Sequence, residues 1–209
     1  MREPAVIAVT GPDGSGKSTL CARLSEALGA ARVSVWDAMA SSGLFATRGA
    51  VAEYFQDLDG PSRTLFIYHA LSRSMDLAAR SGARILLVEG YWYKYAVTEI
   101  AYGVDPKFVE AAASAFQKPL LTIRLDVAAE ESWSRKSAPT AYESGDAEAP
   151  GVPSEARYVA FQSRLRPIWE SLEGRHGPWA RVPAGASPEV SLEFALERCR
   201  RALGAEEGR

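Results

Sequence analysis

Short apolar runs alternate with longer amphipathic segments along this chain. The apolar runs, rich in Val, Ile and Leu, predict strands at residues 5–10, 31–36, 84–89, 120–125 and 179–182. Between and after them, apolar spacing and capping residues predict helices at 17–28, 49–58, 62–81, 105–116, 127–136, 154–173 and from 187 onward, with a frayed tail after Gly204. Such alternation is typical of a parallel sheet with helices on both faces. The pattern therefore predicts an α/β fold of three layers, with a five-stranded parallel sheet flanked by helices.

One segment breaks this alternation. Residues 137–156 read SAPTAYESGDAEAPGVPSEA, with three prolines, two glycines, many small residues and no lysine or arginine. A stretch of this composition is not expected to bury a core, so it is predicted to be a mobile loop. The chain of 209 residues is thus expected to form a single domain, 1–209, with a flexible lid inserted at about 137–156.

Composition narrows the class of protein. The chain is 47% hydrophobic and 24% charged, which is ordinary for a globular domain with a full core. Its formal net charge of -2 argues against a nucleic-acid-binding surface as the main function. No apolar run approaches the roughly 20 residues of a membrane span, and the N-terminal stretch lacks a small-residue cleavage site. A cytoplasmic protein without a membrane partner is expected, with Cys21 and Cys199 as reduced, packed thiols.

A phosphate-binding motif follows the first predicted strand. Residues 11–18, GPDGSGKS, fit the pattern G-x-x-x-x-G-K-[ST] and lead into the first predicted helix. The glycines let successive backbone N–H groups turn inward onto phosphate oxygens, and the helix N-terminus faces the same place. Lys17 is expected to contact the β- and γ-phosphates, and Ser18 to place its hydroxyl on Mg²⁺. The predicted ATP-binding residues are Gly11, Asp13, Gly14, Ser15, Gly16, Lys17, Ser18 and Thr19.

The motif alone does not separate kinases from ATPases or GTPases. The chain contains no Asn-Lys-x-Asp segment of the kind that reads guanine, and it has no predicted strand that ends in two carboxylates. One acidic residue, Glu89, ends the run RILLVE, where open α/β sheets bind ligands. A small domain with these features and a polar lid favours a kinase of small molecules.

The order of several segments resembles the thymidylate kinase family. GPDGSGKST is similar to that family's phosphate loop, and TLFIYHALSR to its helix with an aromatic residue four positions before an arginine. RILLVEGY resembles its strand that ends in Asp-Arg-Tyr, RLDVAAEESWSRK its approach to the lid, and VPAGASPEV its adenine-side loop. The resemblance implies a P-loop kinase fold and an ATP- and Mg²⁺-dependent phosphotransferase. It implies dTMP or a related pyrimidine nucleotide as acceptor, and a homodimer.

The resemblance also implies roles for individual residues. Lys17, Glu89 and Arg135 fall on catalytic positions, with Lys136 or Arg157 as other clamps at the lid ends. The acceptor site would comprise Arg48, His69, Arg73, Glu89 and Tyr91. Without the resemblance, His69 and Arg73 read as a solvated helix face, and the aromatic residues 91–95 read equally well as core or as a subunit interface.

Three departures from the family pattern keep other functions open. Gly90 stands where the family has arginine, which leaves Lys94 as a possible replacement cation. His69 stands where the family has phenylalanine, and the lid has no basic residue. One alternative is a deoxynucleoside kinase that uses Glu89 as the base for a sugar hydroxyl. Another is a nucleotide-binding regulator that transfers no phosphate.

Overall fold

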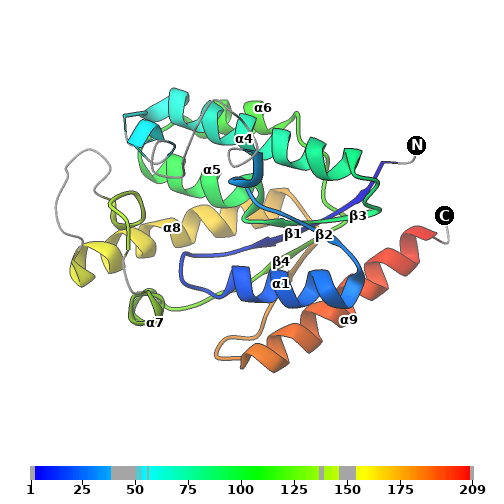
Figure 1. Ribbon diagram of the computed structural model, residues 1–209. Coiled ribbons are helices and arrows are strands. Elements are labelled where there is room, and N and C mark those ends of the chain that lie inside the picture. The colour runs from blue at the N-terminus through cyan, green and yellow to red at the C-terminus, as the bar shows by residue number, and fades with distance from the viewer. Residues whose placement is uncertain are drawn as a thin grey trace.

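The computed structural model describes residues 3–38, 51, 53–55, 57–136, 139–145 and 154–207 of the chain. Within these residues, a five-stranded sheet has the order β2-β3-β1-β4-β5, and all neighbouring strands are parallel (Figure 1). This confirms the predicted α/β architecture. The strands are β1 (Ala5–Thr10), β2 (Ala31–Val33), β3 (Ile85–Glu89), β4 (Leu121–Arg124) and β5 (Trp179–Arg181).

Alternate side chains of the central strand β1 point to opposite faces of the sheet and enter two separate cores. Val6 and Ala8 join one hydrophobic cluster, whereas Ile7 and Val9 join the other. In Figure 1, α1 and α9 lie together on one side of the sheet. The first cluster is covered by α4 (Gly60–Arg80), α5 (Tyr91–Ala101), α6 (Pro106–Ala113) and α8 (Glu155–Arg175), and the second by α1 (Lys17–Leu28) and α9 (Pro188–Glu207).

Several helix boundaries differ from the predicted ones by a few residues. Helix α4 begins at Gly60 rather than at Ser62, because Pro61 fits the first turn of a helix. Helix α9 continues to Glu207, so the predicted fraying after Gly204 is wrong. Of the helix predicted at 49–58, residues 51 and 53–55 are helical, and residues 49, 50, 52 and 56 lie outside the described residues.

Helix α5 was not predicted. Nine of its eleven residues are buried, because it packs between β1, α4, α6 and α8. A helix covered on nearly all sides lacks the alternation of polar and apolar residues that reveals an amphipathic helix. None of the helices in the described ranges is both long enough and apolar enough to cross a membrane.

The described part of the predicted lid packs onto the body of the protein. Residues 139–145 contain a 3₁₀ turn, η1 (Tyr142–Ser144). The Tyr142 hydroxyl donates a hydrogen bond to the Glu99 carboxylate at 2.8 Å, and its ring meets Phe55 edge-on at 5.1 Å. The prediction that this stretch would make no core contacts is therefore wrong for residues 139–145. Residues 137–138 and 146–153 lie outside the described residues.

Candidate active site

The loop between β1 and α1 has the backbone shape that its glycines predict. Gly11, Gly14 and Gly16 all have positive φ, at 141°, 75° and 89°. A Cβ atom on Gly11 would lie 2.3 Å from the carbonyl oxygen of Leu125, and one on Gly14 would lie 2.7 Å from that of Ser132. Side chains at these two positions would collide with the backbone that follows β4. The glycines therefore allow both the left-handed conformation and the close approach of two chain segments.

This loop forms one wall of a cavity of about 720 Å³. The cavity lies outside the carboxyl ends of the parallel strands, where open α/β sheets bind ligands. Most of the predicted residues of the loop border it, together with residues from β3, α5, α7 and the start of α9. The sequence-predicted residues that line it are Asp13, Gly14, Ser15, Gly16, Lys17, Ser18, Thr19, Glu89, Lys94, Arg135 and Lys136.

A buried lysine, a partly buried lysine and one carboxylate set the charge at the floor of the cavity. Lys17 is 7% exposed and donates a hydrogen bond to the carbonyl of Pro12. Burial lowers the pKa of Lys17 to about 8, and nearby Asp13 opposes part of that effect. The Lys94 ammonium lies 2.7 Å from Asp13 Oδ1. Burial alone would raise the pKa of Asp13, but Lys94 and Lys17 outweigh it and hold that pKa at about 2.

Two oxygen-bearing side chains that could bind a metal ion, those of Ser18 and Glu89, meet beside the phosphate loop. The Ser18 hydroxyl donates to Glu89 Oε1, while the Arg32 guanidinium lies 2.6 Å from Glu89 Oε2. Hydroxyl and carboxylate oxygens are suitable Mg²⁺ ligands, so this pair fits the ion. Within the described ranges, no group of three or more His, Cys, Asp or Glu side chains forms a metal site. Phosphate oxygens and water would have to complete the coordination, as is usual for Mg²⁺.

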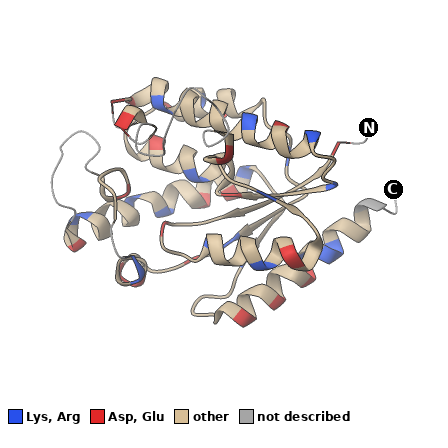
Figure 2. Ribbon diagram, in the orientation of Figure 1, with Lys and Arg blue, Asp and Glu red and all other residues tan. Residues whose placement is uncertain are grey.

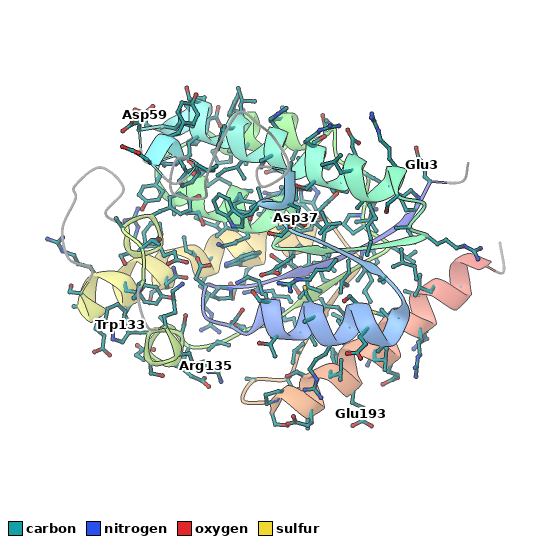
Figure 3. All side chains as sticks on the ribbon, in the orientation of Figure 1. Glu3, Asp37, Asp59, Trp133, Arg135 and Glu193 are labelled. Atoms are coloured by element: carbon teal, nitrogen blue, oxygen red, sulfur yellow. The ribbon has the colours of Figure 1, made fainter. Side chains whose placement is uncertain are left out.

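A third group of charges lies where α7 (Ala129–Arg135) ends, close to the loop. Arg135, labelled in Figure 3, is exposed and pairs with Glu131 one helical turn earlier. Lys136 pairs with Glu143 of the lid segment at 2.7 Å and is more sheltered. All four residues line the cavity. Figure 2 shows basic and acidic residues interspersed along the outer helices of the described chain.

Comparison with known proteins supports the fold. No family model matches the chain, and no curated protein matches its sequence. Among solved structures, a thymidylate kinase from Candida albicans matches with a TM-score of 0.63 and 15% identity, over 98% of this chain and 93% of that one. The chain has a thymidylate-kinase-like fold. At this identity the likeness extends to the fold, so the roles of individual residues must be judged from the geometry of this chain.

Of the predicted acceptor residues, Glu89 lines the cavity, whereas Tyr91, His69 and Arg73 do not. Tyr91 is fully buried, and its hydroxyl donates to the carbonyl of Gln117. Tyr91 therefore offers no exposed surface to the cavity, contrary to its predicted place in the acceptor site. His69 and Arg73 lie on the exposed face of α4 and do not border the cavity. Arg48 lies outside the described residues.

The structure instead adds residues that no motif identified. Trp36 and Ser34, which follow β2, line the cavity, and Arg32 holds Glu89. Beneath the loop, the hydroxyls of Ser132 and Tyr158 both donate to the carbonyl of Asp13. These contacts join segments 57 to 145 residues apart in sequence, so no local pattern could have indicated them.

Proposed function

We propose that this chain is an ATP-dependent kinase that transfers the γ-phosphate to a nucleoside monophosphate, with dTMP or a related pyrimidine nucleotide as the first acceptor to test. One observation supports this proposal above the others. The phosphate loop, with Lys17 and Ser18, opens into the same cavity as Glu89 and Lys94 from the β3–α5 connection. A single cavity with cations and oxygen donors on two sides suits the transfer of phosphate between two bound molecules.

Each charged group has a place in such a reaction. Lys17 and the loop amides would bind the β- and γ-phosphates, and Ser18 with Glu89 would hold Mg²⁺, which neutralises phosphate charge when bound. An acceptor phosphate oxygen would form the new bond to the γ-phosphorus as the bond to ADP breaks. Lys94, Arg135 and Lys136 are positioned around the cavity to stabilise the charge of the transferring group.

The geometry of Glu89 bears on the choice between acceptors. One carboxylate oxygen accepts from Ser18, and the other pairs with Arg32. A carboxylate engaged at both oxygens suits the role of an anchor for Mg²⁺ better than that of a base for a sugar hydroxyl. This favours a nucleoside monophosphate over an unphosphorylated deoxynucleoside as acceptor.

The proposal is tested by a coupled ADP-release screen with ATP and Mg²⁺ across pyrimidine and purine nucleoside monophosphates and the matching nucleosides. We expect turnover with at least one monophosphate. Turnover with nucleosides alone would instead make the chain a nucleoside kinase. Tight ATP binding without turnover of any acceptor would support a regulator that transfers no phosphate.

The pKa of Lys17 predicts that ATP binding takes up a proton. Bound phosphates favour the ammonium form, so they raise the pKa of Lys17 from its value of about 8 in the free protein. At pH 8.5 only about a quarter of free Lys17 is protonated, so binding should take up about three quarters of a proton. At pH 7.5 the uptake should fall to about a quarter of a proton.

Isothermal titration calorimetry with MgATP in buffers of different ionisation enthalpy measures this uptake directly. The comparison of the two pH values serves as an internal control, because both lie above the range in which the phosphates of MgATP titrate. An uptake that is equal at pH 7.5 and pH 8.5, or that is absent at pH 8.5, would contradict the assignment of the proton to Lys17.

A further inference from the structure

One exposed aromatic ring lines the cavity. Trp36 is 42% exposed and borders the cavity beside Ser34. The other large hydrophobic side chains that are exposed in the described residues, Tyr54, Leu65 and Val190, do not border it. An indole is among the largest apolar surfaces that a protein can bury, and here a large part of it is left open to a polar site.

The turn after β2 holds this ring in place. The backbone N–H of Ser34 donates to Asp37 Oδ2 at 2.7 Å, and the N–H of Asp37 donates back to the carbonyl of Ser34 at 3.1 Å. Figure 3 labels Asp37, which closes the turn. Val35, next to Trp36 in the chain, is buried in the core, whereas Trp36 is exposed. The indole also meets Phe55 edge-on at 6.5 Å.

The strand order places Trp36 on one side of the phosphate loop. The loop follows β1, at the centre of the sheet, whereas Trp36 follows the edge strand β2. The opposite edge strand, β5, leads to the other end of the cavity, lined by Val182, Pro183, Gly185 and Ala186. Each edge strand is two strand spacings, or about 10 Å, from β1. The cavity thus has one end on each side of the phosphate-binding centre.

We propose that Trp36 is the stacking platform for the nucleobase of the acceptor. This inference rests on the proposed function, because it assumes that the acceptor carries a base. The adenine of ATP occupies the opposite end, at the β5 side, and both sets of phosphates meet at the loop. Glu89 also lines the cavity. It ends β3, which lies in the sheet between β2, the strand before Trp36, and β1, the strand before the phosphate loop.

The chemistry of an indole predicts how the site selects its acceptor. Every nucleobase has a π-face, so stacking on Trp36 favours a flat ring without distinguishing one base from another. The acceptor site is therefore expected to accept several bases with similar affinity.

Tryptophan fluorescence of the original protein and of Trp133→Phe, together with calorimetric titration of every variant to give its affinity, tests the proposal without requiring turnover. All five tryptophans lie in the described residues: Trp92 and Trp169 are buried, Trp133 and Trp179 are half-buried, and Trp36 is the one that lines the cavity, so quenching of its fluorescence reports on that site. Full-length protein is titrated, without ATP, with dTMP, dCMP, dGMP and the matching nucleosides. The variants are Trp36→Ala, Trp36→Phe and the control Trp133→Phe. Trp133 packs against Tyr158 and does not border the cavity.

We expect quenching by more than one monophosphate, and an affinity about 10- to 100-fold weaker in Trp36→Ala. Trp36→Phe should keep most of the affinity, and Trp133→Phe should keep both the affinity and the quenching. All variants should bind ATP within about twofold of the original protein.

Equal acceptor affinity in Trp36→Ala overturns the inference even if the ADP-release screen succeeds. Binding of ATP alone that depends on Trp36 also overturns it, because the ring then belongs to the donor. Loss of acceptor binding in Trp36→Ala supports it even if the screen finds no turnover, in which case only the proposed kinase activity fails.

Discussion

Replacing Lys17 with alanine is expected to lower the rate of phosphoryl transfer by at least about 10³-fold, without loss of folding. The ammonium of Lys17 is buried in the loop at the floor of the cavity, where the dielectric is low and its charge acts strongly on phosphate. Burial disfavours this charge in the free protein, as the lowered pKa of about 8 shows. The alanine variant should therefore be at least as stable as the original protein at pH 7.

The stability difference should change with pH in a defined direction. Because the folded pKa of Lys17 lies below its ordinary value of 10.5, the unfolded chain binds more protons between pH 8 and pH 10.5. The original protein should gain stability relative to Lys17→Ala across that window, and the stability difference between the two proteins should be constant below it.

Coupled ADP release measures the loss of rate in Lys17→Ala, and urea unfolding measures the stability difference. Exposed Lys107, which does not border the cavity, provides the matched control as Lys107→Ala. Activity above a tenth of the original rate in Lys17→Ala would mean that this lysine is not the phosphate clamp.

Replacing Arg63 with methionine is expected to lower the free energy of unfolding by about 3–5 kcal/mol. Arg63 forms two hydrogen bonds to Glu99, at 2.8 and 3.1 Å, and a third to the carbonyl of Leu58. The side chains of Arg63 and Glu99 are 3% and 0% exposed. Methionine would leave the Glu99 carboxylate buried, with the Tyr142 hydroxyl as a remaining donor. An unpaired charge in the interior is among the most destabilising changes that a single substitution can make.

The double variant Arg63→Met, Glu99→Leu is the control for this effect. It removes both charges and keeps similar volume, so it should regain a large part of the lost stability. Urea unfolding of the original protein and the variants gives the three free energies. If the single change cost under about 1 kcal/mol, or if the double variant were the less stable of the two, the charge of Glu99 would not be the cause. The Lys107→Ala protein again provides a surface reference.

Local signals explain which parts of the fold could be predicted. The strand at Ala5–Thr10 and the helix at Lys17–Leu28 have the predicted boundaries, because an apolar run, a glycine loop and Gly29 mark their ends. On α4, Ile67, Leu71 and Met75 are buried and Asp76 is exposed, as the helical spacing predicts. These features depend on residues close in sequence, so they can be read from one chain.

The remaining features depend on contacts between distant segments. Arg63 lies in the first turn of α4, and nothing near it in sequence indicates that it is buried, because its partner Glu99 is 36 residues away on the unpredicted α5. For the same reason the cavity wall beyond the loop was only partly predicted. Glu89 could be placed there because it ends a predicted strand. Trp36 reaches the wall, and Arg32 reaches Glu89, because β2 lies beside β3 in the sheet, an order that the sequence does not show. A resemblance to a family could suggest Tyr91 for the site, but only packing shows that its ring is inside.

The conformation of Gly90 limits how this site could be redesigned. Its φ is +81°, its N–H donates to the carbonyl of Val9, and its carbonyl accepts from the Thr10 hydroxyl. A larger residue would be strained in that backbone, although its Cβ would make only ordinary contacts with the stem of Lys94. Grafting an arginine into position 90 would thus disturb the end of the central strand before it supplied any charge. A cation on this wall is better introduced one helical turn further along, and there the chain already carries Lys94.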